Sequence, residues 1–307
     1  MRLLLLASTL ALGVASAAAA QDGAPPGATS GSGEDVVVVG KNNRADQRQE
    51  VRNFVRALDN LTGTDPIARF DQDSSCPAVI GLNGPRNAAI VERMRRVAKA
   101  VGIPVSDSGC KPNVLVIIAR NKDETIKALR QKQPIFFRDA AGRPISVPKD
   151  KGPATAWQLS GLVDRRGTPV AVDPLAHRYV LDTPEGASLI NSAARPVVHG
   201  SVLVMNVDAL VGLTMTQIAD YAAMRAFAPT QPRKLKDSGA STILTILDAP
   251  ADSMVPLTLT QWDQAYLRAL YATGAYHNAY SQRADMARRI SNSLEHPHVG
   301  QPDREAN

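Results

Sequence analysis

The residues best suited to chemistry in this sequence are a histidine, an aspartate and a tyrosine: His199, Asp220 and Tyr221. His199 and Ser201 are two positions apart in an apolar run that predicts a strand over 197–207, so their side chains would share one face. A histidine beside a serine could activate a nucleophile, but no third residue is placed to orient the imidazole. Two interpretations follow: a hydrolase with a site around His199, Asp220 and Tyr221, or a histidine held in the core or at a strand edge.

Other groups of ionisable side chains have simpler explanations. Asp220 and Asp263 lie on two predicted helices that are expected to pack together, where they could form an acid–base pair or act as capping and surface residues. Glu295, His296 and His298 could bind a metal adventitiously, but they lie in a polar C-terminal stretch. The sequence has neither a Gly-x-x-x-x-Gly-Lys phosphate loop nor a Gly-x-Ser-x-Gly elbow. We therefore expect no cofactor and no metal.

Two helices in the C-terminal half have clear start signals. Thr214 and Gln217 form a predicted capping box for a helix over 215–228. Thr260 is the predicted N-cap of a second helix, with Asp263 three residues further on. These helices frame the part of the chain in which a site would be sought.

A Ser-Met-Val-Pro turn at 253–256 lies between the two helices, and this order of elements resembles the C-terminal half of a metzincin-type zinc peptidase domain. In that family the first helix carries two histidines that bind zinc and a glutamate that activates water. The resemblance places other residues at the two histidine positions, the glutamate and the third histidine: Gln217, Tyr221, Ile218 and Phe227. It makes Met254 the counterpart of the methionine that lies under the zinc. It therefore implies a degenerate, zincin-like domain without the zinc-binding motif.

The N-terminal half supplies the expected sheet. Apolar runs at 76–82 and 113–119 predict two strands, and the apolar stripe over 88–101 predicts a helix between them with Asn87 as its N-cap. A strand–helix–strand unit of this kind makes the two strands parallel and adjacent. Cys76 and Cys110 would then lie at the same end of the sheet and pair as a disulfide. The expected fold is α+β, a mixed sheet with packed helices, clipped by this disulfide.

The ends of the chain predict export. Residues 1–20 have the charge, apolar core and small-residue cleavage site of a signal peptide. Residues 21–34 are rich in Pro, Gly and Ser, which predicts a disordered linker. A globular domain is expected over 35–290, with possible lobes at 35–150 and 151–290, and a polar disordered tail over 291–307. The short run at 35–40 resembles the first strand of the plug domain in outer-membrane receptors, which suggests an envelope accessory role as a third possibility.

Charge and composition restrict the partners. The net charge of +6 is modest, and aromatic residues make up 4% of the chain, which gives little support to a nucleic-acid interface. No apolar run after the signal peptide is long enough to span a membrane. The leading hypothesis is a periplasmic or secreted, non-catalytic binding or scaffolding protein that recognises a protein partner in the cell envelope.

Overall fold

Four apolar segments pair into one mixed sheet, in the order β1 (Pro77–Ile80), β2 (Val114–Ala119), β6 (Ala194–Asn206) and β3 (Ala154–Asp164). β1 with β2 and β2 with β6 are parallel pairs, whereas β3 runs antiparallel to β6. The central strand β2 and residues 202–205 of its neighbour β6 are continuously apolar because both of their faces are covered. β3 is the strand at one edge of the sheet.

The computed structural model describes residues 44–58, 65–71, 74–181, 191–235, 238–250 and 253–296. These residues belong to one compact unit, Lys41–Asn307. The predicted signal peptide at 1–20, the linker at 21–34 and the strand at 35–40 lie outside the described residues, as do residues 297–307 of the predicted tail. No helix in the described part of the chain is long and apolar enough to cross a membrane.

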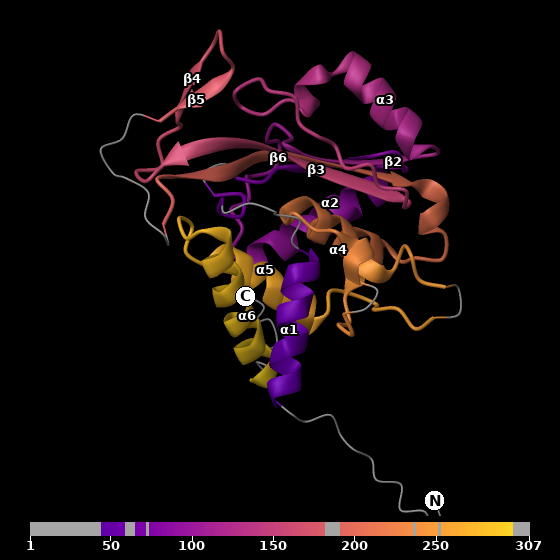
Figure 1. Ribbon diagram of the computed structural model, residues 1–307. Helices are drawn as coiled ribbons and strands as arrows, with labels where there is room; N and C mark the ends of the chain where they lie inside the picture. Colours follow the sequence, from indigo (N-terminus) through magenta and orange to yellow (C-terminus); the bar gives the residue numbers. More distant parts are fainter. Residues whose placement is uncertain are drawn as a thin grey trace, which may run out of the picture. The chain divides into compact units, whose positions relative to one another are not determined.

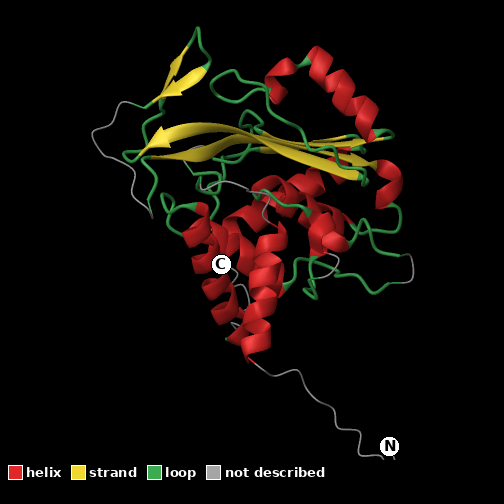
Figure 2. Ribbon diagram, viewed as in Figure 1, coloured by secondary structure: helices red, strands yellow, loops and turns green. Residues whose placement is uncertain are grey.

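Helices lie on both faces of the sheet, most of them on one (Figures 1 and 2). On the populated side are α1 (Arg44–Leu58), α2 (Gly84–Ala100), α4 (Met215–Phe227), α5 (Gln261–Ala272) and α6 (Ala279–Glu295). The other face carries α3 (Lys122–Lys132) and the short helix η1 (Pro134–Phe137). The main core lies between the sheet and the five helices.

A smaller core cluster lies on the α3 side of the sheet. It is made of five buried side chains, Ile117, Phe137, Trp157, Val202 and Val204. The remaining strands, β4 (Ala171–Asp173) and β5 (Arg178–Val180), form a separate two-stranded hairpin. Since β3 joins the main sheet, the two possible lobes at 35–150 and 151–290 share one sheet and one core.

The predicted disulfide is present. Cys76 and Cys110 are bonded, with their Cα atoms 6.1 Å apart. Cys76 directly precedes β1, and Cys110 lies in the connection that leads into β2, so the bond closes the strand–helix–strand unit at one end of the sheet. The α+β class and the disulfide are both confirmed, as is the parallel pairing of β1 with β2.

The start of α2 differs from its prediction. The helix begins at Gly84, and its N-cap is Asn83, whose side chain accepts a hydrogen bond from the Arg86 amide (3.1 Å). Gly84 and Pro85 thus belong to the first turn of the helix, because proline is readily accommodated there. Asn87, the predicted N-cap, instead binds the Leu82 backbone amide and carbonyl at 3.2 and 3.0 Å.

The C-terminal boundary also needs correction. The predicted disordered tail begins at 291, but α6 continues to Glu295. Ile290 is fully buried and Ser291 is buried as well, so packing extends the helix beyond the point where the sequence becomes polar.

Candidate binding groove between two helices

The residues predicted to do chemistry are not gathered into one site. His199 lies in β6 where the register steps from the Leu159–Gly200 pair to the Ser160–Val198 pair, a β-bulge. Val198 packs in the main core and Val202 in the smaller cluster on the opposite face, so the bulge breaks the alternation between them. The prediction that His199 and Ser201 share one face assumed an unbroken alternation, so the bulge removes its basis.

The surroundings of His199 and Ser201 do not form a nucleophile–base pair. The His199 ring lies so close to Gly161 that a Cβ on the glycine would come within 2.5 Å of the imidazole Nε2. The Ser201 hydroxyl is buried and has no hydrogen-bond partner among the described residues, so it is not bonded to the imidazole.

Asp220 is a structural carboxylate. It has no exposed surface and accepts hydrogen bonds from Arg93 Nε and Nη2 at 2.7 and 3.0 Å. Thr258 Oγ1 and the Leu259 amide also donate to it, at 2.6 and 2.9 Å. Asp220 therefore joins α4 to α2 and to the segment before α5.

Asp263 binds the residue directly before α5 and the segment at 242–243. It accepts from the Thr260 amide and from the Ile243 amide, each at 2.9 Å, and from the Thr242 hydroxyl. Burial raises the pKa of Asp263, and these hydrogen bonds oppose that effect. The two carboxylates thus satisfy separate sets of donors and do not form the acid–base pair that we considered.

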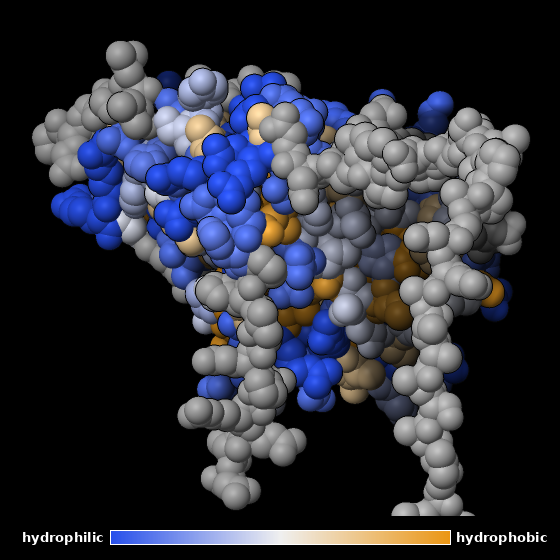
Figure 3. Space-filling view, turned by 90° about the horizontal axis from the view of Figure 1, so that it is seen from below, coloured by the Kyte–Doolittle hydropathy of each residue, from blue (hydrophilic) through white to orange (hydrophobic). Residues whose placement is uncertain are grey.

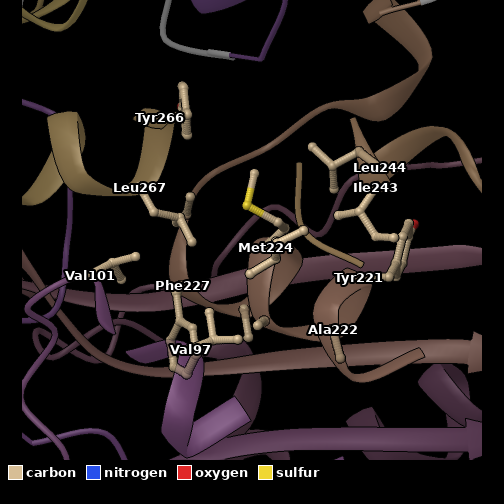
Figure 4. Close-up of a cluster of buried hydrophobic side chains, with 14 of the residues drawn as sticks. Val97, Val101, Tyr221, Ala222, Met224, Phe227, Ile243, Leu244, Tyr266 and Leu267 are labelled. Carbon is tan, nitrogen blue, oxygen red and sulfur yellow. The ribbon is translucent and has the colours of Figure 1, made fainter. Parts of the chain in front are cut away.

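Tyr221 and Gln217 are held in packing and capping. Tyr221 is 3% exposed and lies beside Ile243 and Leu244 (Figure 4). Burial raises the pKa of its phenol. Gln217 completes the capping box with Thr214, as predicted, and donates to the Pro256 carbonyl at 2.8 Å.

The expectation for Met254 is wrong. Its side chain is 101% exposed, whereas the metzincin resemblance places it beneath a site. Among the described residues, no group of three or more His, Cys, Asp or Glu side chains could hold a metal ion. Of the residues named for the hydrolase alternative, Asp220 is bound in hydrogen bonds between elements, Tyr221 is packed in the core and His199 lies against Gly161.

A different feature stands out on the surface, a groove between α1 and α6. One end is a hollow of about 530 Å³ lined by residues of both helices and of η3 (Pro232–Leu235), namely Arg52, Val55, Arg56, Lys234, Tyr280, Arg283, Ala284 and Ala287. An adjoining hollow of about 370 Å³ shares three of these residues, and its lining is Arg48, Arg52, Ala284, Ala287, Arg288, Ser291 and Asn292. We call the two together the basic groove.

The folding of α1 explains why the groove is basic. Val51, Phe54, Val55 and Leu58 are buried, and Phe54 makes edge-to-face contact with Trp262 of α5 at 5.2 Å. The arginines of α1 recur every four residues, at Arg44, Arg48, Arg52 and Arg56. This spacing keeps them in one stripe along the helix.

The charge of the groove is only partly balanced. Its lining includes six basic side chains and no acidic one. Arg48 pairs with Glu295 at 3.4 Å, and Arg288 pairs with Asp285. Neither Arg56 nor Lys234 is in an ion pair within the described ranges, and both are exposed. Figure 3 views this helical side of the molecule and shows hydrophilic surface interrupted by apolar patches.

The sequence carries a signal for this groove in the spacing of the α1 arginines. The densest basic patch in the sequence is at 93–99, but there Arg93 is bound to Asp220 and Arg95 to the Ser106 carbonyl. The four-residue arginine spacing of α1 was the better indicator, because it survives packing as an exposed stripe. The basic residues that α6 adds to the groove cannot be predicted in this way, because they depend on how α6 packs against α1.

Comparison of the chain with protein-family models, curated proteins and solved structures finds no match in any of the three.

Proposed function

We propose that this chain is a non-catalytic binding protein of the periplasm or cell exterior, and that its basic groove holds an acidic segment of a partner protein. The observation that carries the proposal is a groove lined by six basic side chains and no acidic one. Arginine binds carboxylates through two parallel N–H groups, so a row of arginines suits a chain of Asp and Glu side chains.

The form of the groove favours a peptide segment over other anions. Ala284 and the exposed ring of Tyr280 add apolar surface between the cations, which suits a segment that carries both acidic and apolar side chains. A flat membrane surface would contact the rims of a concave groove better than its floor. The disulfide supports an oxidising compartment, where nucleic acid is not the expected partner.

The zincin-like resemblance remains part of the proposal at the level of element order. What supports it is the order of a capped helix, the segment that contains Met254 and a second capped helix. Because Met254 is exposed, the resemblance extends to the order of the elements and not to the position of this side chain.

The test is binding of a fluorescein-labelled synthetic peptide of alternating Glu and Leu, measured by fluorescence anisotropy. We expect the R52E/R56E double variant to weaken binding at least tenfold, since two favourable charges become repulsive. Raising sodium chloride to about 0.3 M should weaken wild-type binding as well.

The matched control is R86E/R120E, which makes the same change of charge at two exposed arginines that line neither hollow. Its affinity should stay within about twofold of the wild type. Equal loss in both double variants would mean that only net charge matters, and unchanged binding in R52E/R56E would exclude the groove. Vesicles of anionic lipid that bind more tightly than the peptide would also overturn the proposal.

A further inference from the structure

A second, smaller pocket lies at the free edge of the sheet, beside β3. Its volume is about 190 Å³, below the range of sites for drug-sized ligands. It is enclosed by part of β3, the end of α4 and two connecting segments, and its lining is Ile145, Ser146, Pro148, Ala156, Trp157, Gln158, Arg225, Ala228, Pro229, Thr230 and Gln231.

Arg225 brings a buried positive charge to this pocket. It lies in the last turn of α4 and is 4% exposed. Its guanidinium lies 6.0 Å from the centre of the Tyr221 ring, and it is in no ion pair with any described residue. Asp150, whose charge acts on Tyr221, pairs with Arg233 at 3.0 Å.

A buried guanidinium without a counter-ion is costly. The negative end of the α4 dipole and the Tyr221 ring stabilise the charge of Arg225 in part. Neither of them accepts a hydrogen bond from Nε, which is buried and without a partner in the described part of the chain.

Two more polar residues of the pocket have a buried side-chain atom without a hydrogen-bond partner in the described part of the chain. Gln158 Nε2 and Thr230 Oγ1 are also buried and have no hydrogen-bond partner among the described residues. Gln158 Nε2 and Arg225 Nε can only donate, and the Thr230 hydroxyl can donate too. Buried donors are normally satisfied, so these three require an acceptor-rich group that carries negative charge.

The rest of the lining indicates what kind of ligand would carry the negatively charged group. Ile145, Pro148, Trp157, Ala228 and Pro229 present apolar or aromatic surface. An inorganic phosphate would leave most of its oxygens facing this surface, whereas a carboxylate with a small apolar body would match both parts of the pocket.

We propose that this pocket binds a small monocarboxylate, whose carboxylate is held by Arg225, Gln158 and Thr230 and whose apolar body packs against Trp157. The site is separate from the basic groove and does not depend on the function proposed for it.

The test uses benzoate as the probe, with ligand-observed NMR and titration calorimetry on the full mature chain. Benzyl alcohol is the neutral comparison of similar size, and inorganic phosphate is the anion without an apolar body. We expect benzoate to bind, benzyl alcohol to bind at least tenfold more weakly and phosphate not to compete. Equal binding of benzyl alcohol, preferential binding of phosphate or no benzoate binding would each overturn the proposal.

Variants locate the binding to the pocket. Arg225→Met should weaken benzoate by about a hundredfold, and Arg225→Lys, which keeps the charge but loses the planar fork, by about tenfold. Arg120→Met, at an exposed position outside the pocket, should leave the affinity unchanged. If Arg225→Met does not fold, Gln158→Leu and Thr230→Val each remove one donor, and unchanged benzoate affinity in both would exclude the pocket.

Discussion

Asp220 shows how a residue with catalytic chemistry can serve the fold instead. Its carboxylate is fully buried, and the four hydrogen bonds described above come from two donors on Arg93 and two in the segment at 258–259. Replacing it leaves several buried donors without an acceptor at once, which is the situation in which a single substitution is most damaging.

Asp220→Ala should lower the free energy of unfolding by about 3 kcal/mol, because it breaks an ion pair whose carboxylate is buried and leaves the Leu259 amide unsatisfied. Urea unfolding followed by circular dichroism measures this loss. Asp107→Ala is the control, since Asp107 is an exposed aspartate that is in no ion pair with any described residue. A loss under about 1 kcal/mol in Asp220→Ala would contradict the structural role.

Asp285 makes the stability of the fold depend on pH. Burial opposes its ionisation, but hydrogen bonds from Arg289 and Arg288 outweigh that effect and lower the pKa of Asp285 to about 2. A lowered pKa stabilises the fold at pH values above the ordinary aspartate pKa, and this contribution disappears as the pH falls toward the folded value.

We therefore expect the unfolding free energy of the wild type to fall between about pH 4 and pH 2, and to fall less in Asp285→Asn. Urea titrations at several pH values compare the two slopes. Asp263 acts in the opposite direction, because its raised pKa stabilises the fold at low pH and that contribution is lost as the pH rises through the folded value. Parallel slopes in the two proteins would assign the acid dependence to other groups.

At the scale of elements, the unit from β1 to β2 is the part of the fold that the sequence predicts best. The strands are continuous apolar runs, the helix between them has a clear stripe, and the parallel pairing follows from the connection. Both capping boxes are also predictable, because each is formed by residues three positions apart.

The disulfide fixes this unit. Replacing Cys76 and Cys110 together with Ser should lower the unfolding free energy by about 4 kcal/mol on the chain-entropy estimate for a loop of this length. Thermal and urea unfolding of the double variant, compared with the wild type, measure the effect. The wild type under reducing conditions is the matched comparison, and it should lose a similar amount if the bond itself is responsible.

Features formed by contacts between distant elements escape prediction. The bulge at His199 depends on the register that β6 adopts with β3. Arg225 ends a helix, where an arginine is usually solvated, and only the packing of β3 and 228–231 buries it. Met254 follows a sequence pattern that holds in one family, and the local pattern does not determine whether its side chain is covered.

At the scale of the whole molecule, the hydrophobic core and the candidate binding sites lie in different places. The faces of α1, α4 and α5 that turn inward supply the core, and the candidate binding surfaces occupy what is left at the margins, between α1 and α6 and at the edge of β3. A largely buried helix can still contribute to a binding site. The helix α4 is buried along nearly all its length, and its Arg225 lines a pocket.

The position of β6 in the sheet has a consequence for how the protein is made. β6 lies between β2 and β3, and its Ser201 pairs with Val114, far earlier in the chain. Synthesis proceeds from the N-terminus, so β1, α2 and β2 exist well before their central neighbour. Closing so long a loop is slow, and until then the apolar edge of β2 has no partner strand. The nascent chain, more than the finished protein, is therefore the form most exposed to aggregation.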